Sequence, residues 1–184
     1  MKKYRILAVT LARGGSKSIK KKNIYKINGK PLLYYTIKQA LKSKLITRYI
    51  VSTDDREIQK IAIKYGAECP FLRPKKLAGD KSSATQADIH ALKWAEKNER
   101  CKYDFFVELL ATNPLKTYKD IDNVLKKLIK TGADSVIGMV KLEDHHPLRI
   151  KKIVNGRIAN FKKNLIEIPE GERQDLKPAA YIRN

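Results

Sequence analysis

The chain alternates short apolar runs with longer stretches in which apolar residues recur at helical spacing. The apolar runs lie at residues 6–11, 49–53, 69–72, 105–110 and 135–140. Between them, apolar positions three and four residues apart predict helices over about 31–41, 56–65, 86–98 and 120–130. Strands that are separated by helices form parallel βαβ units. The sequence therefore predicts a three-layer α/β fold around a mostly parallel sheet.

The periodicity weakens after Lys141, which suggests a second region. We expect an α/β core over residues 1–140 and a small C-terminal lobe over 141–184 that supplies substrate or dimer contacts. With 184 residues, 42% of them hydrophobic, the chain can bury a sizeable core. No apolar run is long enough for a membrane span, and the short N-terminal run lacks a signal-peptide cleavage pattern, so we expect a cytoplasmic protein.

The chain is strongly basic, with 40 Lys and Arg against 19 Asp and Glu and a net charge of +21. Nucleic-acid binding is one interpretation of such a charge. The lysines, however, are spread along the whole chain, and no nucleic-acid motif accompanies them, so we expect no specific nucleic-acid partner. The two cysteines, Cys69 and Cys101, give neither a disulfide framework nor metal-ligand spacing.

A basic, glycine-containing loop follows the first apolar run. It reads LARGGSK over residues 11–17, and Lys22 and Asn23 follow shortly after. Glycine has no Cβ, so backbone N–H groups can approach an anion closely while the nearby cations neutralise it. The spacing fits neither the P-loop nor the dinucleotide fingerprint, and a basic turn that binds nothing is the alternative. The loop predicts a triphosphate site.

Polar loops also follow the apolar runs that end at Thr53, Leu72 and Leu110. In a parallel α/β sheet, ligands bind beyond the carboxyl ends of the strands. We therefore expect these loops to meet the basic loop at one edge of the sheet.

Seven segments carry a resemblance to a known family. They are, in order, LARGGSKSIKKKN, NGKPLL, VSTDD, FLRPKKLAGDKSSAT, LLATNPLK, DHHPLR and RQDLKPAAYIRN. This ordered set resembles the acylneuraminate cytidylyltransferases, which make CMP-sialic acid and its legionaminic and pseudaminic relatives for cell-surface glycans. The resemblance implies a Rossmann-like nucleotidyltransferase fold and a homodimer. It also implies transfer of CMP from CTP to the anomeric hydroxyl of a nine-carbon keto-sugar acid, with release of pyrophosphate.

The resemblance also assigns roles to individual residues. The implied catalytic residues are Arg13, Lys17 and Lys22. The implied nucleotide-binding residues are Leu11, Ala12, Arg13, Gly14, Gly15, Ser16, Lys17, Lys22, Asn23, Arg73 and Ser83, with Ser82 and Thr85 as alternatives to Ser83. The implied substrate-binding residues are Thr112, Asn113, Arg173 and Gln174, of which the last two reach the partner subunit's site in the family. Leu110 and Ala111 replace a Gln and a Pro that are common in the family, which leaves the identity of the sugar open.

The family's catalytic Mg²⁺ is held by acidic residues that lie beyond the position of Asn184. The resemblance thus implies Mg²⁺ as a cofactor without ligands in this span, and we expect low activity from residues 1–184 alone. We expect Asp54 to cap the helix that follows it, His90 to be packed or at the surface of its helix rather than catalytic, and His145 and His146 to shape a turn near the sugar-binding lobe. Two alternatives stay open: a catalytically silent or truncated nucleotide-binding subunit, and a nucleotidyltransferase of the same fold acting on another keto-acid, such as 3-deoxy-manno-octulosonate.

Overall fold

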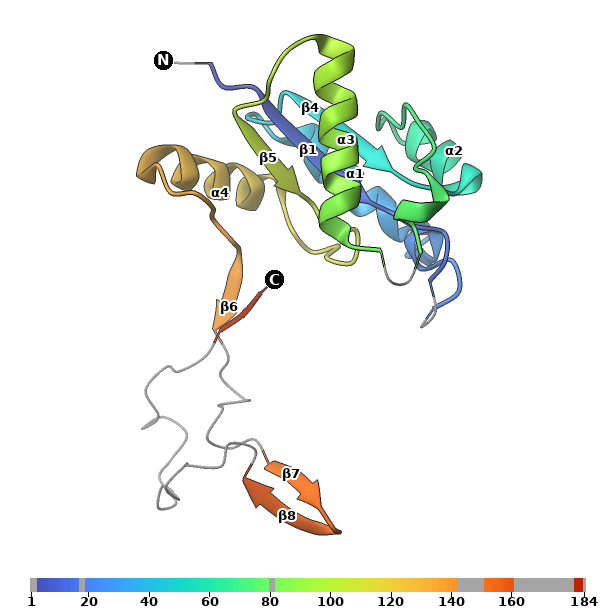
Figure 1. Ribbon diagram of the computed structural model, residues 1–184, viewed down its shortest axis with the longest axis vertical. Coiled ribbons are helices and arrows are strands. Elements are labelled where there is room, and N and C mark those ends of the chain that lie inside the picture. Colours follow the sequence, from blue (N-terminus) through green and yellow to red (C-terminus); the bar gives the residue numbers. More distant parts are fainter. Residues whose placement is uncertain (1–2, 17–18, 80–81, 142–150, 161–180, 184) are drawn as a thin grey trace. The chain divides into compact units, whose positions relative to one another are not determined.

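The computed structural model describes residues 3–16, 19–79, 82–141, 151–160 and 181–183 (Figure 1). The chain divides into two compact units, Met1–Gly132 and Ala133–Asn184. The sequence predicts a boundary after residue 140, where the periodicity weakens. The compact units instead divide between Gly132 and Ala133, directly after the last helix of the first unit.

The first unit contains a three-stranded parallel sheet. Its strands are β1 (Ile6–Leu11), β4 (Arg48–Ser52) and β5 (Phe105–Glu108), in the order β4-β1-β5. Leu7 of β1 lies opposite Arg48 of β4 and Phe106 of β5, which sets the register. The central strand β1 is covered on both faces, and this explains why its sequence is a continuous apolar run.

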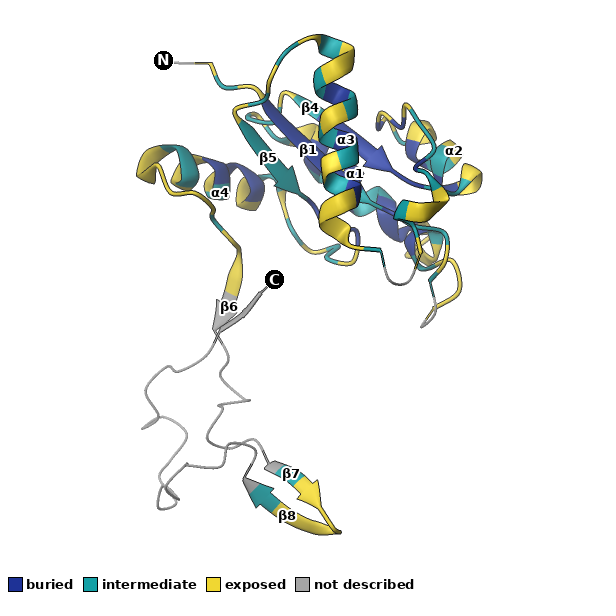
Figure 2. Cartoon of the chain, viewed as in Figure 1, coloured by how far each residue is buried: buried dark blue, intermediate teal, exposed yellow. Residues whose placement is uncertain are grey.

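Helices cover both faces of this sheet, as Figure 2 shows by their buried stripes. The helices α1 (Leu32–Lys42), α2 (Arg56–Lys64) and α4 (Tyr118–Thr131) pack against one face, where their apolar residues join Ile6 and Ala8 of β1 in one core cluster. Helix α3 (Ala84–Glu99) covers the other face with Ala91 and Ala95, next to Leu7 and Val9. This alternation along β1 confirms the predicted three-layer α/β fold. None of the described helices combines the length and apolarity that a membrane span requires.

A chain of buried hydrogen bonds links β4, β1 and the residue that follows β5. The hydroxyl of Tyr49 on β4 donates to Thr10 Oγ1 on β1 over 2.8 Å. Thr10 Oγ1 donates in turn to the carbonyl oxygen of Leu109, just after β5, over 2.8 Å. The chain thereby fixes the point at which the loop after β5 leaves the sheet.

Between β1 and α1 lie three short elements. They are the 3₁₀ helix η1 (Lys22–Ile24) and the strands β2 (Lys26–Ile27) and β3 (Lys30–Pro31), which form an antiparallel hairpin. Asn28 and Gly29 join the two strands with φ angles of 48° and 74°, the positive values that an Asn-Gly hairpin turn requires.

The strand predicted over 69–72 is wrong as a regular strand. This segment makes only two isolated parallel bridges with the chain at β4, Ile50 with Glu68 and Thr53 with Leu72. Pro70 lies between them and has no N–H to donate to a ladder, so regular pairing stops there. The 3₁₀ helix η2 (Lys75–Leu77) follows.

In the second unit, the described strands form two antiparallel pairs. Strand β6 (Met139–Lys141) pairs with β9 (Tyr181–Arg183), and β7 (Lys151–Val154) pairs with β8 (Arg157–Asn160). The strand predicted over 135–140 is therefore wrong in its first four residues, since it begins only at Met139. A second Asn-Gly turn, with φ angles of 51° at Asn155 and 75° at Gly156, connects β7 to β8.

Candidate functional site

A cavity of about 550 Å³ opens in the first unit where β1 and β5 end and α3 begins. Its position confirms the expectation that the polar loops after these strands meet at one edge of the sheet. Of the residues assigned from sequence, eight line it: Leu11, Arg13, Ser16, Lys22, Asn23, Arg73, Ser83 and Thr112. The sequence assignment did not include Leu77, Ala78, Gly79, Ala84, Ala87, Glu108 and Leu110, which also line it.

Hydrogen bonds to neighbouring segments hold the basic loop in shape. The N–H of Ala12 donates to the carbonyl of Ser52 over 3.0 Å, which extends the pairing of β1 with β4 by one residue. Ala12 is fully buried, so it belongs to the core beneath the cavity rather than to its wall. Asn23 Nδ2 donates to the carbonyl of Arg13 over 3.0 Å, and Arg13 Nη1 lies 3.4 Å from the carbonyl of Gly79. The Arg13 side chain thereby connects the basic loop to Gly79, which also lines the cavity.

Gly14 approaches the start of α2 more closely than any side chain would allow. Its N–H donates to Asp54 Oδ1 over 3.0 Å, and a Cβ at this position would lie 2.7 Å from Asp55 Oδ2. The Asp55 carboxylate accepts hydrogen bonds from the N–H groups of Glu57 and Ile58, so Asp55 is the N-cap of α2. The expectation that Asp54 caps this helix is wrong, because Asp54 faces back toward Gly14.

Arg73 brings a buried cation to the cavity. Only 4% of the residue is exposed, and its N–H donates to the carbonyl of Thr53 over 2.7 Å. Its Nη2 lies 3.8 Å from Asp54 Oδ1, while its Nε has no hydrogen-bond partner within the described residues. Burial lowers the pKa of Arg73, and the charges of Asp54 and Asp88 oppose that shift. The guanidinium therefore has donor capacity that a ligand in the cavity can use.

Two carboxylates lie on the same side of the sheet as α3. Burial, followed by the negative charge of Glu108, raises the pKa of Asp88 to about 7, while Arg73 acts in the opposite direction. Asp88 Oδ1 is buried without a partner in the described part of the chain. The sequence assignment missed Asp88, although its spacing of three and seven residues from Ala91 and Ala95 places it on the inward face of the predicted helix.

His90 packs against a neighbouring aromatic ring, in agreement with the expectation that it is not catalytic. Its ring contacts Phe71 edge-on, with 4.9 Å between the ring centroids. Burial and the charge of Arg73 lower the pKa of His90, which keeps the imidazole neutral at physiological pH.

The remaining assigned residues divide into three sets. Gly14, Gly15 and Asn113 lie close to the cavity in the chain without lining it, whereas both Ser82 and Ser83 line it and Thr85 does not. Lys17, Arg173, Gln174, His145 and His146 lie outside the described residues. Asn113 instead contributes its carbonyl to a contact with Lys116 over 2.6 Å.

The described residues do not form a Mg²⁺ site by themselves. No group of three or more His, Cys, Asp or Glu side chains occurs among them in an arrangement that could hold a metal ion. Asp54, a carboxylate beside the basic loop, already accepts a hydrogen bond from Gly14 and lies 3.8 Å from Arg73 Nη2. The described residues therefore supply no ligand set for the Mg²⁺ that the family resemblance implies.

The chain matches the family model described as cytidylyltransferase over residues 7–155. It is 35% identical over 157 residues to the post-translational flagellin modification protein B of Campylobacter coli, which covers 85% of this chain and 67% of that protein. It is 36% identical over 137 residues to the pseudaminic acid cytidylyltransferase of Campylobacter jejuni (74% and 59% covered). It is also 38% identical over 122 residues to the N-acylneuraminate cytidylyltransferase of Escherichia coli (66% and 28% covered).

Solved structures share the fold at lower identity. A CMP:2-keto-3-deoxy-manno-octonic acid synthetase complexed with CTP superposes with a TM-score of 0.59 at 21% identity, covering 83% of this chain and 61% of that one. A 4-diphosphocytidyl-2C-methyl-D-erythritol synthase gives a TM-score of 0.65 at 12% identity (86% and 68% covered).

The parallel sheet with helices on both faces, together with its likeness to these solved structures, gives this protein the Rossmann-like α/β fold of the nucleotidyltransferases. Within that class, the chain belongs to the cytidylyltransferase family. It spans between 28% and 67% of the length of the three relatives described above.

Proposed function

We propose that this protein binds CTP and transfers CMP to the anomeric hydroxyl of a sialic-acid-like nine-carbon keto-sugar acid, releasing pyrophosphate. The observation that carries the proposal is the cavity in which Arg13, Lys22 and Arg73 surround the carboxyl edge of the sheet. The family match and the names of the relatives support the choice of cytidine and of this class of acid.

The reaction requires charge neutralisation and alignment more than covalent chemistry from the protein. The sugar hydroxyl loses its proton to solvent as its oxygen forms a bond to the α-phosphorus, the bond to pyrophosphate breaks, and negative charge moves onto the departing phosphates. Arg13 of the basic loop and Lys22 shortly after it line the cavity, and they supply positive charge to the triphosphate end of CTP. Such fixed charges stabilise a developing anion without reorganising during the reaction.

The start of α3 adds a second source of positive potential. Ser83, Ala84 and Ala87 of its first turns line the cavity, and the Ser83 side chain makes no capping hydrogen bond. The free N–H groups of a helix N-terminus attract anions, so α3 favours a phosphate or carboxylate in this cavity. Ser83 Oγ is then available to a ligand hydroxyl.

The wall formed by the loop after β5 faces the acceptor in this proposal. Leu110 and Thr112 line it, with one apolar side chain and one hydroxyl. Relatives are named for pseudaminic, legionaminic and N-acylneuraminic acids, and these names support an acceptor of this class. We propose that the acceptor is one of these nine-carbon acids, that Mg²⁺ enters with the triphosphate, and that the enzyme works as a cytoplasmic homodimer.

The experiment that tests this function is CTP binding by calorimetry, with and without Mg²⁺, on the wild type and on Arg13→Ala. We expect CTP to bind in preference to UTP, ATP and GTP, and Arg13→Ala to weaken binding about 100-fold, which corresponds to about 2.7 kcal/mol. Arg56→Ala removes a guanidinium from an exposed position at the start of α2 and serves as the matched control. Equal CTP affinity in Arg13→Ala, or a folded chain that binds no CTP, contradicts the proposal.

A second measurement separates an enzyme from a silent nucleotide-binding subunit. Pyrophosphate release is followed with CTP, Mg²⁺ and each of the three acids. Release with one acid, lost in Arg13→Ala, supports the transferase, whereas tight CTP binding without release with any acid supports the silent subunit.

A further inference from the structure

A β-turn shortly after β5 forms part of the cavity wall. The N–H of Asn113 donates to the carbonyl of Leu110 over 3.3 Å, so residues 110–113 form a β-turn with Ala111 and Thr112 at its corners. Leu110 and Thr112 line the cavity, and Ala111 is buried against the core. The position of this turn therefore determines the shape of one cavity wall.

One ammonium group holds both ends of this turn. Lys116 Nζ donates to the carbonyl oxygens of Leu110 and Asn113, each over 2.6 Å. Its third contact is Thr36 Oγ1 on α1, at 2.9 Å. Thr36 is fully buried, and its hydroxyl lies 3.3 Å from the same Leu110 carbonyl. The lysine therefore links the turn to a buried residue of α1.

The partners of this ammonium are all neutral oxygens. Among the described residues, no carboxylate forms an ion pair with Lys116, in contrast to Lys21 and Lys102. Burial lowers the pKa of Lys116 to about 8. The three N–H donors of the ammonium are thus all taken up by carbonyl and hydroxyl oxygens of the turn and of α1.

We propose that Lys116 is a positioning residue for the acceptor substrate: by binding the carbonyls at both ends of the 110–113 turn, it sets the cavity wall that Leu110 and Thr112 form. This inference rests on the proposed function, because it assigns the turn to the acceptor side of the same cavity. It predicts an effect on the keto-sugar acid that exceeds the effect on CTP.

The test compares Lys116→Met, Lys116→Arg and Lys119→Met with the wild type. Met keeps the length of the side chain without any donor, Arg keeps the charge, and Lys119 is an exposed lysine three residues further on. We expect Lys116→Met to raise the KM for the acid at least tenfold while the calorimetric Kd for CTP changes less than twofold. Lys116→Arg should restore a large part of the loss, and Lys119→Met should match the wild type.

A pH profile adds a measurement that a purely structural role would not change. Above pH 8 the neutral amine has two N–H groups for three oxygen acceptors and no charge, so the KM for the acid should rise in the wild type. Lys116→Arg should lack this rise, because a guanidinium stays protonated. Equal losses of CTP and acid affinity in Lys116→Met, or wild-type kinetics in that variant, overturn the inference.

The proposed function can fail independently of this inference. A wild type that binds no CTP refutes the function, and the role of Lys116 is then judged from hydrogen exchange of the Asn113 amide. At least tenfold faster exchange in Lys116→Met, but not in Lys119→Met, supports the clamp. Unchanged exchange overturns it.

Discussion

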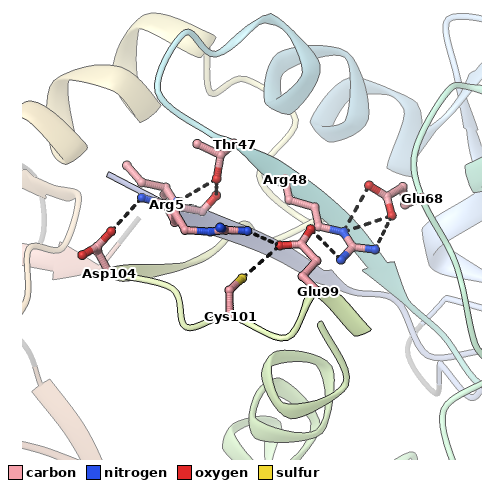
Figure 3. A network of polar contacts seen from close by, with 8 residues as sticks. Arg5, Thr47, Arg48, Glu68, Glu99, Cys101 and Asp104 are labelled. Carbon is pink, nitrogen blue, oxygen red and sulfur yellow. Dashed lines mark hydrogen bonds and ion pairs between the residues drawn. The ribbon is translucent and has the colours of Figure 1, made fainter. Parts of the chain in front are cut away.

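The two ends of the same parallel strands use charged residues in opposite ways. At the amino end, Arg5 and Arg48 meet carboxylates directly, as Figure 3 shows. Arg48 makes three contacts of 2.8–3.3 Å with Glu68 and one of 2.9 Å with Glu99, and Arg5 Nη2 donates to Glu99 over 2.8 Å. At the carboxyl end, the nearest ion-pair contact of Arg73 is 3.8 Å long.

The difference shows what each end contributes. The amino-end network satisfies its own charges, so it joins β1 and β4 to the C-terminal end of α3 and contributes stability. At the carboxyl end, buried polar atoms of Arg73 and Asp88 keep unmet hydrogen-bonding capacity within the described structure. A protein tolerates such groups where a ligand completes them. The comparison predicts that mutations at the two ends separate binding from stability.

The largest expected effect is on binding, from Arg73→Met. This variant removes the buried cation of the cavity and should weaken CTP binding about 100-fold, or about 2.7 kcal/mol, in calorimetry. Its free energy of unfolding should change less than that of an amino-end variant, because the burial cost of the charge is removed together with its contacts. Unchanged CTP affinity would show that Arg73 serves the fold alone.

The matched amino-end variant is Arg48→Met. Its side chain is only 11% exposed and bridges two carboxylates, so its loss should reduce the free energy of unfolding by about 2 kcal/mol in urea titrations. The CTP affinity of the folded protein should stay within twofold of the wild type. A large loss of affinity in this variant would contradict the separation between the two ends.

A smaller effect is expected from the glycine pair of the basic loop. A Cβ on Gly14 meets Asp55 at 2.7 Å, so Gly14→Ala should displace the N-cap carboxylate of α2 and cost about 1 kcal/mol of stability as well as CTP affinity. Gly15 has no atom within 4 Å of an added Cβ, so Gly15→Ala should remain close to the wild type. Thermal unfolding with and without CTP measures both, and equal behaviour of the two variants would refute the close-approach argument.

The smallest expected effect is a pH dependence at Asp88. Its folded pKa, about 7, lies above the ordinary value, so the stability that this group contributes is present at low pH and lost as the pH rises toward 7. Asp88→Asn cannot titrate, and its stability relative to the wild type should therefore increase by about 1 kcal/mol from pH 5 to pH 8. Urea titrations at the two pH values test the sign, and a constant difference would mean that Asp88 does not titrate in this range.

Much of the fold could be predicted because the spacing of apolar residues and the polar loops between elements are local properties of the sequence. The apolar run of β1 and the helical spacing of α1 to α4 were sufficient for the three-layer fold, and the polar loops placed Arg13, Asn23 and Arg73 at one edge. Pairings that form across layers could not be predicted in this way. The proximity of Asp88 to Glu108 depends on how α3 sits on β5, and the choice of Asp55 over Asp54 as N-cap depends on the exact start of α2.

The contact of Lys116 with Leu110 and Asn113 illustrates the same limit. The sequence shows a lysine after a Pro-Leu step, which is typical of a solvated loop residue. Its burial depends on Thr36 in α1, a helix that lies 80 positions away along the chain.

The buried hydroxyl chain from Tyr49 through Thr10 to Leu109 has a consequence for the order of folding. Its last hydrogen bond joins residues 99 positions apart, and it can form only when β5 has docked beside β1. Contacts between such distant segments close late, because the loop between them must first lose its conformational entropy. We therefore expect the wall that carries Leu110 and Thr112 to form late in folding. Nucleotide binding would then report completion of the sheet, and a refolding experiment that follows CTP affinity would measure the docking of β5.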